Sequence, residues 1–266
     1  MQPENMKVML TGACGGIGEA VTRRLAATGA SLFLCDLDDK KLARLGEELR
    51  AQSVAGQIIS TARVDLLDDQ QVEAWVSDIT TRHEINVLIN NAGYCRFGMF
   101  EDSLDRDIEL TMQLNSMAPM KLTRKLLPML KQQPEARIVN ISSTFGAIGF
   151  PGYTVYSSSK YAIRGFTQAL SRELADSNVR VGCLLPRATR TPFNSAEVVE
   201  MNKKLKVAMD PPEKVAQSLV NFLGTGRGEL AIGWPEKLLV RLNYLFPAII
   251  GNAIARKLPL IKQYAA

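Results

Sequence analysis

The sequence predicts an α/β fold in which a seven-stranded, doubly wound parallel sheet carries helices on both faces. Seven short apolar runs alternate with longer amphipathic segments along the chain. The runs are rich in Val, Ile and Leu, as strands covered on both faces are. Strands that alternate with helices are joined by right-handed crossovers, which build a parallel sheet. Gly-rich and Asn-rich segments follow the strands, at the edge where such sheets bind ligands.

The predicted strands span residues 7–10, 31–35, 56–64, 86–90, 136–142, 179–185 and 228–233. The predicted helices span residues 18–29, 38–52, 68–80, 103–132, 155–176 and 210–223. Local signals mark several helix ends: Gly29 is a good helix stop, acidic residues open the third helix, and prolines occupy the first turn of the last.

Composition places the chain among ordinary globular proteins. It has 266 residues, of which 46% are hydrophobic and 22% charged, and it can bury a large core. Its four cysteines form no C-x-x-C pair and no zinc-binding spacing, so we expect free thiols, no metal site and a reducing compartment. The N-terminus lacks the apolar centre of a signal peptide, and we therefore expect a cytoplasmic protein. The single histidine, His83, lies in a polar stretch and is expected at the surface, which disfavours a Ser-His-Asp mechanism.

Positive charge gathers at the C-terminal end. The net charge is +5, and no acidic residue follows Glu236, whereas five basic residues do. The chain has no compact basic cluster with interleaved aromatic residues, so we expect no nucleic acid partner. Residues 237–266 are apolar but too often interrupted for a membrane-spanning helix. Three interpretations stay open for this extension: a lid over the substrate or a subunit contact, which we favour, and an in-plane membrane anchor with basic flanks.

A glycine-rich loop follows the first predicted strand. Residues 11–18 read TGACGGIG, with Gly12, Gly16 and Gly18 between a strand and a helix. Glycine allows a tight turn and lets a pyrophosphate approach the helix N-terminus, where the amides favour negative charge. No Gly-Lys-Ser/Thr follows, which excludes a P-loop. The loop therefore predicts a dinucleotide site in a Rossmann fold.

An acidic residue near the end of the second predicted strand indicates which dinucleotide binds. Asp36 can accept hydrogen bonds from both ribose hydroxyls of an adenosine and would repel a 2′-phosphate. No Arg or Lys follows it directly, so we predict NAD(H) over NADP(H). The alternative is that Asp36 caps the next helix.

Two further segments follow the third and fourth strands. Asp65 could bond the adenine amino group or cap a helix, and both roles are compatible. The segment NNAG at 90–93, with Asn91, Ala92 and Gly93, is expected either to contact the ligand or to anchor neighbouring strands.

These motifs, together with Asn115, the segment ISS at 141–143 and YSSSK at 156–160, resemble the short-chain dehydrogenase/reductase family over roughly residues 6–235. The resemblance implies a Tyr156 base with Lys160, a catalytic Ser143 rather than Ser142, and Asn115 on a helix. It also implies cofactor contacts from Cys14 and Ile17 in the glycine loop, and from Pro186 and Thr191 in PRATRT, where Arg187 replaces the family's usual glycine. One catalytic domain would cover residues 1–236, followed by the extension 237–266.

The chemistry of such a site can be reasoned from its side chains. A free tyrosine titrates near about 10, and a cation one helical turn away favours its phenolate. Tyr156 has Lys160 in that position, whereas Tyr153 is followed by Ser157, so Tyr156 is the predicted acid–base. Ser143 would hydrogen-bond the substrate oxygen, and Asn115 would hold a water that links the lysine to solvent.

The segments near the predicted acid–base are apolar. Phe97, Phe145, Phe150 and Tyr153 are expected to line the substrate pocket, which predicts an apolar alcohol, ketone or aldehyde as substrate. Plain packing of loops is the alternative for each of them. For Arg187 an acidic substrate group, the cofactor phosphates and solvent all stay open as partners.

The family further implies a substrate-side flap over residues 195–225 and a dimer or tetramer formed through the helices at 103–132 and 155–176. We expect an NAD-dependent alcohol dehydrogenase or carbonyl reductase. The alternatives are an NADP(H)-dependent carbonyl reductase and a non-catalytic dinucleotide-binding sensor or scaffold. Intact Ser143, Tyr156 and Lys160 argue against the last, because binding alone does not require them.

Overall fold

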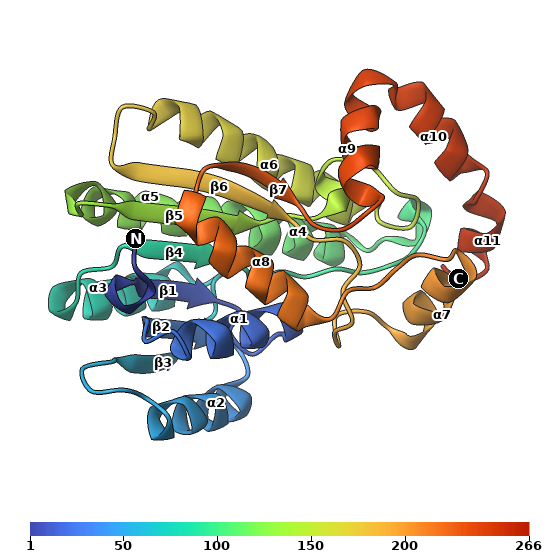
Figure 1. Ribbon diagram of the computed structural model, residues 1–266. Helices are drawn as coiled ribbons and strands as arrows, with labels where there is room; N and C mark the ends of the chain where they lie inside the picture. The colour runs from blue at the N-terminus through green and yellow to red at the C-terminus, as the bar shows by residue number, and fades with distance from the viewer. Residues whose placement is uncertain (266) are drawn as a thin grey trace.

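Seven parallel strands form one sheet in the order β3-β2-β1-β4-β5-β6-β7 in the computed structural model, which describes residues 1–265 (Figure 1). The strands are β1 (Lys7–Thr11), β2 (Ser31–Asp36), β3 (Ile59–Arg63), β4 (Val87–Asn90), β5 (Ala136–Ile141), β6 (Val179–Leu185) and β7 (Gly228–Ala231). The predicted fold class and all seven strands are confirmed. β3 begins three residues later than predicted, because a turn closed by the Gln57 N–H on the Val54 carbonyl precedes it.

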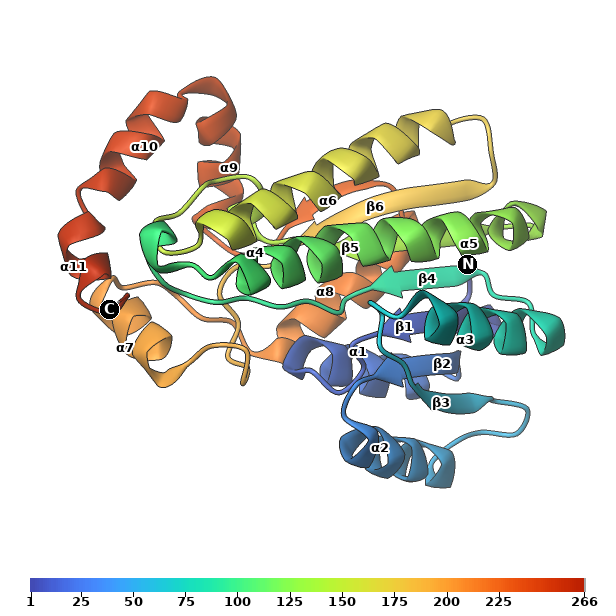
Figure 2. The ribbon, with the colours of Figure 1, turned by 180° about the vertical axis from the view of Figure 1, so that it is seen from behind.

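Helices cover both faces of the sheet, as predicted. One face carries α1 (Gly16–Ala26), α2 (Asp39–Ala51) and α8 (Pro212–Thr225), as Figure 1 shows. The other carries α3 (Asp69–Arg82), α5 (Ala118–Gln132) and α6 (Thr154–Glu173), which lie in front of the strands in Figure 2. The strand order changes direction between β1 and β4, and this switch point opens a crevice at the carboxyl ends of the strands.

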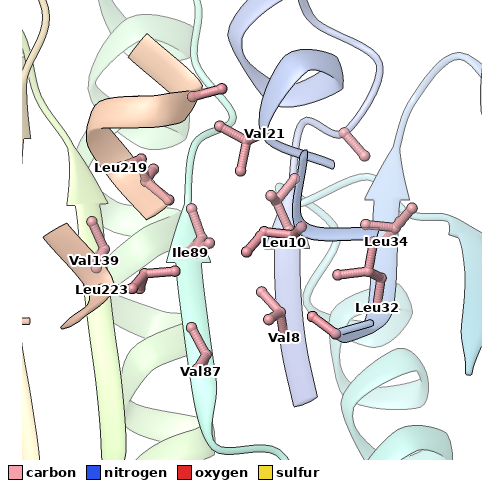
Figure 3. Packing of buried hydrophobic residues seen from close by; sticks show 14 of the residues in the cluster. Val8, Leu10, Val21, Leu32, Leu34, Val87, Ile89, Val139, Leu219 and Leu223 are labelled. Atoms are coloured by element: carbon pink, nitrogen blue, oxygen red, sulfur yellow. The ribbon is translucent and has the colours of Figure 1, made fainter. Parts of the chain in front are cut away.

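Alternate residues of each strand enter two separate cores. Val8 and Leu10 of β1 pack under α1 and α8, whereas Met9 between them enters the core on the other face. Figure 3 shows the first of these cores, where Leu219 and Leu223 of α8 lie beside Val139 of β5 and Ile89 of β4. Because both faces are covered, the central strands β1, β2 and β4 are buried along almost their whole length and show no polar alternation, whereas the edge strands β3 and β7 are partly exposed.

The segment predicted as one helix over 103–132 is divided. α4 (Asp105–Met112) runs into a π-helical turn, η3 (Gln113–Met117), and then into α5. Asn115 lies in the π-helical turn and is almost fully buried. Such turns are frequent at functional sites, because the extra residue per turn redirects side chains.

The C-terminal extension folds back over the carboxyl edge of the sheet. It consists of α9 (Glu236–Leu245), α10 (Pro247–Ala255) and α11 (Leu258–Lys262). These helices form an arc that reaches α7 (Ala196–Lys204) (Figures 1 and 2). Ile261 of α11 is fully buried against Tyr153 and Met201, which attaches the end of the arc to the body. Within residues 1–265, no helix is both long and apolar enough to cross a membrane.

Candidate active site

A single large cavity, of about 1220 Å³, lies at the carboxyl ends of the strands. Loops after β1, β2, β4, β5 and β6 form one side of it, and residues of the C-terminal extension form part of the other. Every residue predicted for the site except Asn115 lines this cavity, and Asn115 lies directly behind its wall.

The glycine loop is closely packed where a phosphate group would approach. Gly12 has a φ of +67°, which favours glycine, and a Cβ atom at Gly18 would lie 1.9 Å from the Gly12 carbonyl oxygen. The loop leads directly into α1, whose first amides have no partner within the helix. A glycine-rich loop at a helix N-terminus leaves room for the pyrophosphate of a dinucleotide next to the free amides.

Asp36 joins this loop to the end of β2. Its Oδ2 accepts a hydrogen bond from the Cys14 N–H at 2.8 Å, and its Oδ1 accepts one from the Asp38 N–H at 3.1 Å. The interpretation of Asp36 as a helix cap is wrong, because Asp38 caps α2 by accepting from the Lys41 N–H. An ionised carboxylate offers about four acceptor positions. Asp36 therefore keeps capacity for two hydroxyl donors in the cavity.

Asp65 makes a local turn instead of a helix cap. Its Oδ1 accepts a hydrogen bond from the Leu67 N–H at 2.9 Å. Asp68 is the residue that caps α3, through hydrogen bonds from the N–H groups of Gln70 and Gln71. Capping by Asp65 is thus wrong, while its position in the cavity near Asp36 is compatible with a contact to a base.

The segment after β4 anchors neighbouring strands. The Asn91 side-chain amide donates hydrogen bonds to the carbonyls of Thr11 and Gly12, at 3.1 and 2.9 Å. In return, the Thr11 hydroxyl accepts from the N–H groups of Asn91 and Ala92. Gly93 comes next and lies against Asn115 and Lys160, since a Cβ there would be 3.1 Å from the Asn115 Oδ1. The anchoring role is therefore present in the structure, and Ala92 and Gly93 also line the cavity.

The two serines after β5 have different surroundings. The Ser142 hydroxyl is buried and donates to the Lys160 carbonyl at 2.8 Å, which fixes α6 to the sheet. Ser143 is only half-buried, faces the cavity, and accepts a hydrogen bond from the Phe145 N–H. Its hydroxyl acts to lower the pKa of the Tyr156 phenol, and both side chains line the cavity. This geometry fits the choice of Ser143 over Ser142.

Tyr156 and Lys160 are one turn apart near the start of α6. The Lys160 Nζ lies 5.7 Å from the centre of the Tyr156 ring and donates a hydrogen bond to the Ile141 carbonyl at 2.9 Å. Lys160 is buried, and Tyr156 is half-buried at the wall of the cavity. Burial raises the pKa of the Tyr156 phenol well above its ordinary value, although the Ser143 hydroxyl opposes this, and it lowers the pKa of the Lys160 ammonium to about 8.

These directions differ from the simple expectation that Lys160 lowers the pKa of Tyr156. Desolvation penalises the charged form of both groups, and it is the largest cause of both pKa shifts. The neutral phenol is therefore favoured in the protein alone.

Asn115 is held from several sides. Its Oδ1 accepts from the Tyr94 N–H at 2.7 Å, and its Nδ2 donates to the Tyr94 carbonyl at 2.8 Å and to the Ser159 hydroxyl at 3.0 Å. The side chain thus fixes the loop after β4 to α6. The water link expected at Asn115 stays a prediction.

Arg187 makes a different contact from those left open by the sequence. Its guanidinium forms a bidentate pair with Asp210, at 2.8 and 2.9 Å, and a further ion pair with Glu236 at 2.9 Å. It also donates to the Trp234 carbonyl. Arg187 therefore joins the loop after β6 to the segments that begin α8 and α9. The side chain is mostly buried and does not face solvent freely.

The other two residues expected from the loop after β6 lie where a cofactor would pass. A Cβ at Gly16 would be 2.4 Å from the Thr191 Cγ2, so this threonine lies across the glycine loop. The Pro186 carbonyl accepts a hydrogen bond from the Thr144 N–H, which holds the loops after β5 and β6 together. Both residues line the cavity, as do Cys14 and Ile17.

The four residues predicted for the substrate pocket form one aromatic cluster beside Tyr156. Phe145 and Phe150 stack with ring centres 5.0 Å apart, and Tyr153 lies 5.0 Å from both Phe145 and Phe97. Sequence reasoning missed Phe193, whose ring lies 6.1 Å from that of Tyr156. It also missed apolar residues from α7 and the extension that complete this wall: Val198, Met201, Leu205, Leu239, Ile250, Ile254 and Tyr264. The apolar composition of the extension was the available signal, but it does not say where the helices fold.

His83 lies outside this site. It ends α3 and packs half-buried against the Phe33 ring, with ring centres 4.9 Å apart. Its partial exposure agrees with the expected surface position, and a nucleophilic triad has no histidine at the cavity.

The Tyr156 phenol and the buried Lys160 ammonium share one cavity with a glycine loop suited to a dinucleotide. This combination indicates a class of oxidoreductases, and comparison with known proteins agrees. The family model described as short chain dehydrogenase matches residues 6–202. The chain belongs to this short-chain dehydrogenase/reductase family.

Among curated relatives, the oxidoreductase UcpA of Salmonella typhimurium is 33% identical, over 84% of each chain. The putative oxidoreductase SadH of Mycobacterium tuberculosis is 29% identical over 97% of this chain and 99% of the relative. A solved short chain dehydrogenase/reductase from Burkholderia phymatum, in complex with NAD, has a TM-score of 0.82 at 24% identity, covering 94% of this chain and 96% of that one. An alcohol dehydrogenase from Thermococcus sibiricus, complexed with 5-hydroxy-NADP, has a TM-score of 0.75 at 24% identity, covering 86% and 96%.

The burial of Lys160 predicts a measurable dependence of stability on pH. Its pKa is about 10.5 in an exposed lysine and about 8 in the folded protein, so between these values the unfolded chain binds more protons. Stability contributed by this position therefore rises with pH across that window. The Lys160→Met variant has no such group. From pH 7 to pH 10 we therefore expect the free energy of unfolding of the parent protein to rise by about 2–3 kcal/mol relative to that of the variant.

Urea unfolding of both proteins at the two pH values measures this difference. Lys131→Met is the matched control, because Lys131 is exposed on α5. A gap between parent and Lys160→Met that stays constant with pH would show that the ammonium is not desolvated.

Proposed function

We propose that the protein is an NAD(H)-dependent oxidoreductase that interconverts an apolar secondary alcohol and its ketone, or an alcohol and its aldehyde. The observation that carries the proposal is the meeting of Ser143, Tyr156 and Lys160 in a cavity with a glycine loop at one end and an aromatic cluster at the other. The nicotinamide, when bound, supplies or accepts the hydride. The chain's own task is to hold the substrate oxygen and move one proton.

In the reductive direction, the neutral Tyr156 phenol donates its proton to the substrate oxygen, and its raised pKa keeps that proton available. The Ser143 hydroxyl donates a hydrogen bond to the same oxygen and holds it in line. Lys160, largely protonated at neutral pH, stabilises the phenolate that remains. Oxidation follows the same groups in reverse. Asn115 fixes the loop and helix that carry them, and a water at Asn115 would return the proton to solvent.

Replacement of the phenol tests this assignment. We expect Tyr156→Phe to bind NADH with unchanged affinity and to lose about 10²–10⁴-fold in turnover, because only the proton donor is removed. NADH fluorescence titration measures binding, and absorbance at the nicotinamide band measures turnover. Tyr161→Phe, an exposed position on the same helix, is the matched control and should keep full activity.

A Tyr156→Phe variant with parental turnover would leave the non-catalytic sensor or scaffold as the better interpretation. That alternative is disfavoured here because a binding module needs neither a buried ammonium nor a serine aimed at a substrate position.

The preference for NAD(H) rests on the charges near Asp36. Asp36, Leu37 and Asp38 line the same end of the cavity, so two carboxylates face the position of an adenosine ribose. A 2′-phosphate would meet both of them, although Lys41 nearby offsets one through its ion pair with Asp38. The NAD bound by the Burkholderia phymatum neighbour is consistent with this proposal, whereas the 5-hydroxy-NADP of the Thermococcus sibiricus neighbour represents the alternative.

We expect Asp36→Arg to shift the ratio of kcat/KM for NADH over NADPH toward NADPH by about tenfold or more, because one repulsive charge becomes an attractive one. Steady-state kinetics with both cofactors and one carbonyl substrate measure the ratio. Asp39→Arg provides a control of equal charge change on α2, outside the cavity. An unchanged ratio in the Asp36 variant would contradict the assignment.

The aromatic cluster supports an apolar substrate. For a series of straight-chain ketones we expect kcat/KM to rise roughly fourfold per added methylene until the cavity is filled, following about 0.8 kcal/mol per buried CH₂. Small charged hydroxy acids should react poorly, since the rings packed beside Tyr156 are aromatic. A panel in which only such acids react would refute the substrate class.

Assembly and location are part of the same proposal. Met117 and Tyr161 remain half-exposed beside α4–α5 and on α6, which supports a homodimer or homotetramer through these helices. Four free cysteines support a reducing compartment such as the cytoplasm. The C-terminal extension is proposed to act as a lid, because its residues line the substrate end of the cavity.

A further inference from the structure

The turn between α9 and α10 exposes an unusual amount of apolar surface. Five side chains form what we term the apolar corner: Leu238, Tyr244, Leu245, Phe246 and Ile249. Leu245 is 70% and Ile249 is 65% exposed, and α10 buries none of its side chains. A helix that is apolar on all sides normally has a cover. We therefore expect the apolar corner to be covered by another molecule.

The corner is held outward by a fixed base. Val240 of α9 is buried, and the Asn243 amide donates to the Ala147 carbonyl at 2.9 Å. The Arg187–Glu236 ion pair fixes the first turn of the same helix. Figures 1 and 2 show the α9–α10 turn at the periphery, beyond the carboxyl edge of the sheet. The apolar side chains are thus presented by an anchored helix.

The charges that follow Glu236 in the sequence are all positive. The charged side chains after Glu236 are Lys237, Arg241, Arg256, Lys257 and Lys262. Arg241 follows Leu238 by three positions, and Arg256 follows Ile249 by seven, so each arginine shares a helix face with an exposed apolar residue. Both arginines are exposed, and within residues 1–265 neither forms an ion pair. Apolar side chains flanked by cations match the boundary of an anionic lipid layer.

A second copy of the chain fits this surface less well. Joining two such corners would bring two sets of basic side chains together with no described carboxylate on the segment to balance them. A lipid surface that carries phosphate groups supplies the opposite charge and also accepts the apolar side chains. Ile250 and Ile254, on the other face of α10, line the cavity. A substrate in the cavity would therefore leave the residues of the apolar corner exposed.

We propose that the apolar corner docks the protein on the surface of an anionic lipid bilayer, with α10 lying in the plane of the interface. The side chains of Leu245, Phe246 and Ile249 enter the boundary between headgroups and acyl chains, and Arg241 and Arg256 contact lipid phosphates. The contact is peripheral and reversible, and it is independent of the substrate proposed above.

Sedimentation with lipid vesicles tests this proposal on the full chain. We expect the protein to pellet with vesicles of phosphatidylcholine mixed with phosphatidylglycerol, and about tenfold or more weakly with phosphatidylcholine alone. Added salt should weaken the binding of the parent protein, a measurement that needs no variant. The Leu245→Ser/Ile249→Ser and Arg241→Glu/Arg256→Glu variants should each lose about tenfold or more in partitioning, with turnover retained. Arg24→Glu/Lys131→Glu makes the same change in net charge at exposed positions elsewhere and should bind as the parent does.

Circular dichroism and retained NADH oxidation establish that each variant is folded. The proposal is overturned if the parent protein does not pellet with the anionic vesicles, or if the corner variants and the control variant behave alike. A third outcome is that the parent protein does not bind vesicles but self-associates, and that the serine variant loses this self-association. That outcome would identify a second copy of the chain as the occupant and would equally overturn the proposal.

Discussion

The side-chain amide of Asn91 donates hydrogen bonds to the carbonyls of Thr11 and Gly12, and so joins the end of β4 to the loop that follows β1. The two strands meet at the switch point of the sheet, where helices leave in opposite directions. The same link brings the Asn91 amide against the start of α1, since a Cβ atom at Gly18 would lie 2.7 Å from the Asn91 Nδ2 and 1.9 Å from the Gly12 carbonyl oxygen. The Asp36 carboxylate completes the same assembly from β2. The cofactor end of the cavity depends on these three strand ends holding one another.

A second balance governs the other end of the cavity. Desolvation favours the neutral forms of both Tyr156 and Lys160. The Ile141 carbonyl holds the Lys160 ammonium in place at 2.9 Å and keeps it one turn from the phenol. The proposed proton transfer at Tyr156 would therefore respond to any charge that enters the cavity.

Local patterns identified most of this arrangement, since strands, the glycine loop and the Tyr-Lys spacing are written in contiguous sequence. What they could not identify depends on tertiary contacts. An aspartate ahead of a helix caps it only if it stands at the single position next to the first helical residue. Asp38 and Asp68 hold that position, whereas Asp36 and Asp65 lie two and three residues earlier. Arg187 is adjacent in sequence to Pro186 but finds Asp210 and Glu236, which lie far along the chain. The fold of residues 237–265 over the cavity follows from the burial of Ile261 against Tyr153, which no periodicity encodes.

The Arg187 contacts tie two distant parts of the chain to one side chain. Its guanidinium pairs with Asp210 ahead of α8 and with Glu236 at the start of α9, while Asn243 and Ile261 hold the rest of the extension against the body. A change at Arg187 would therefore loosen two borders of the cavity at once, so these two segments cannot be redesigned independently of this position.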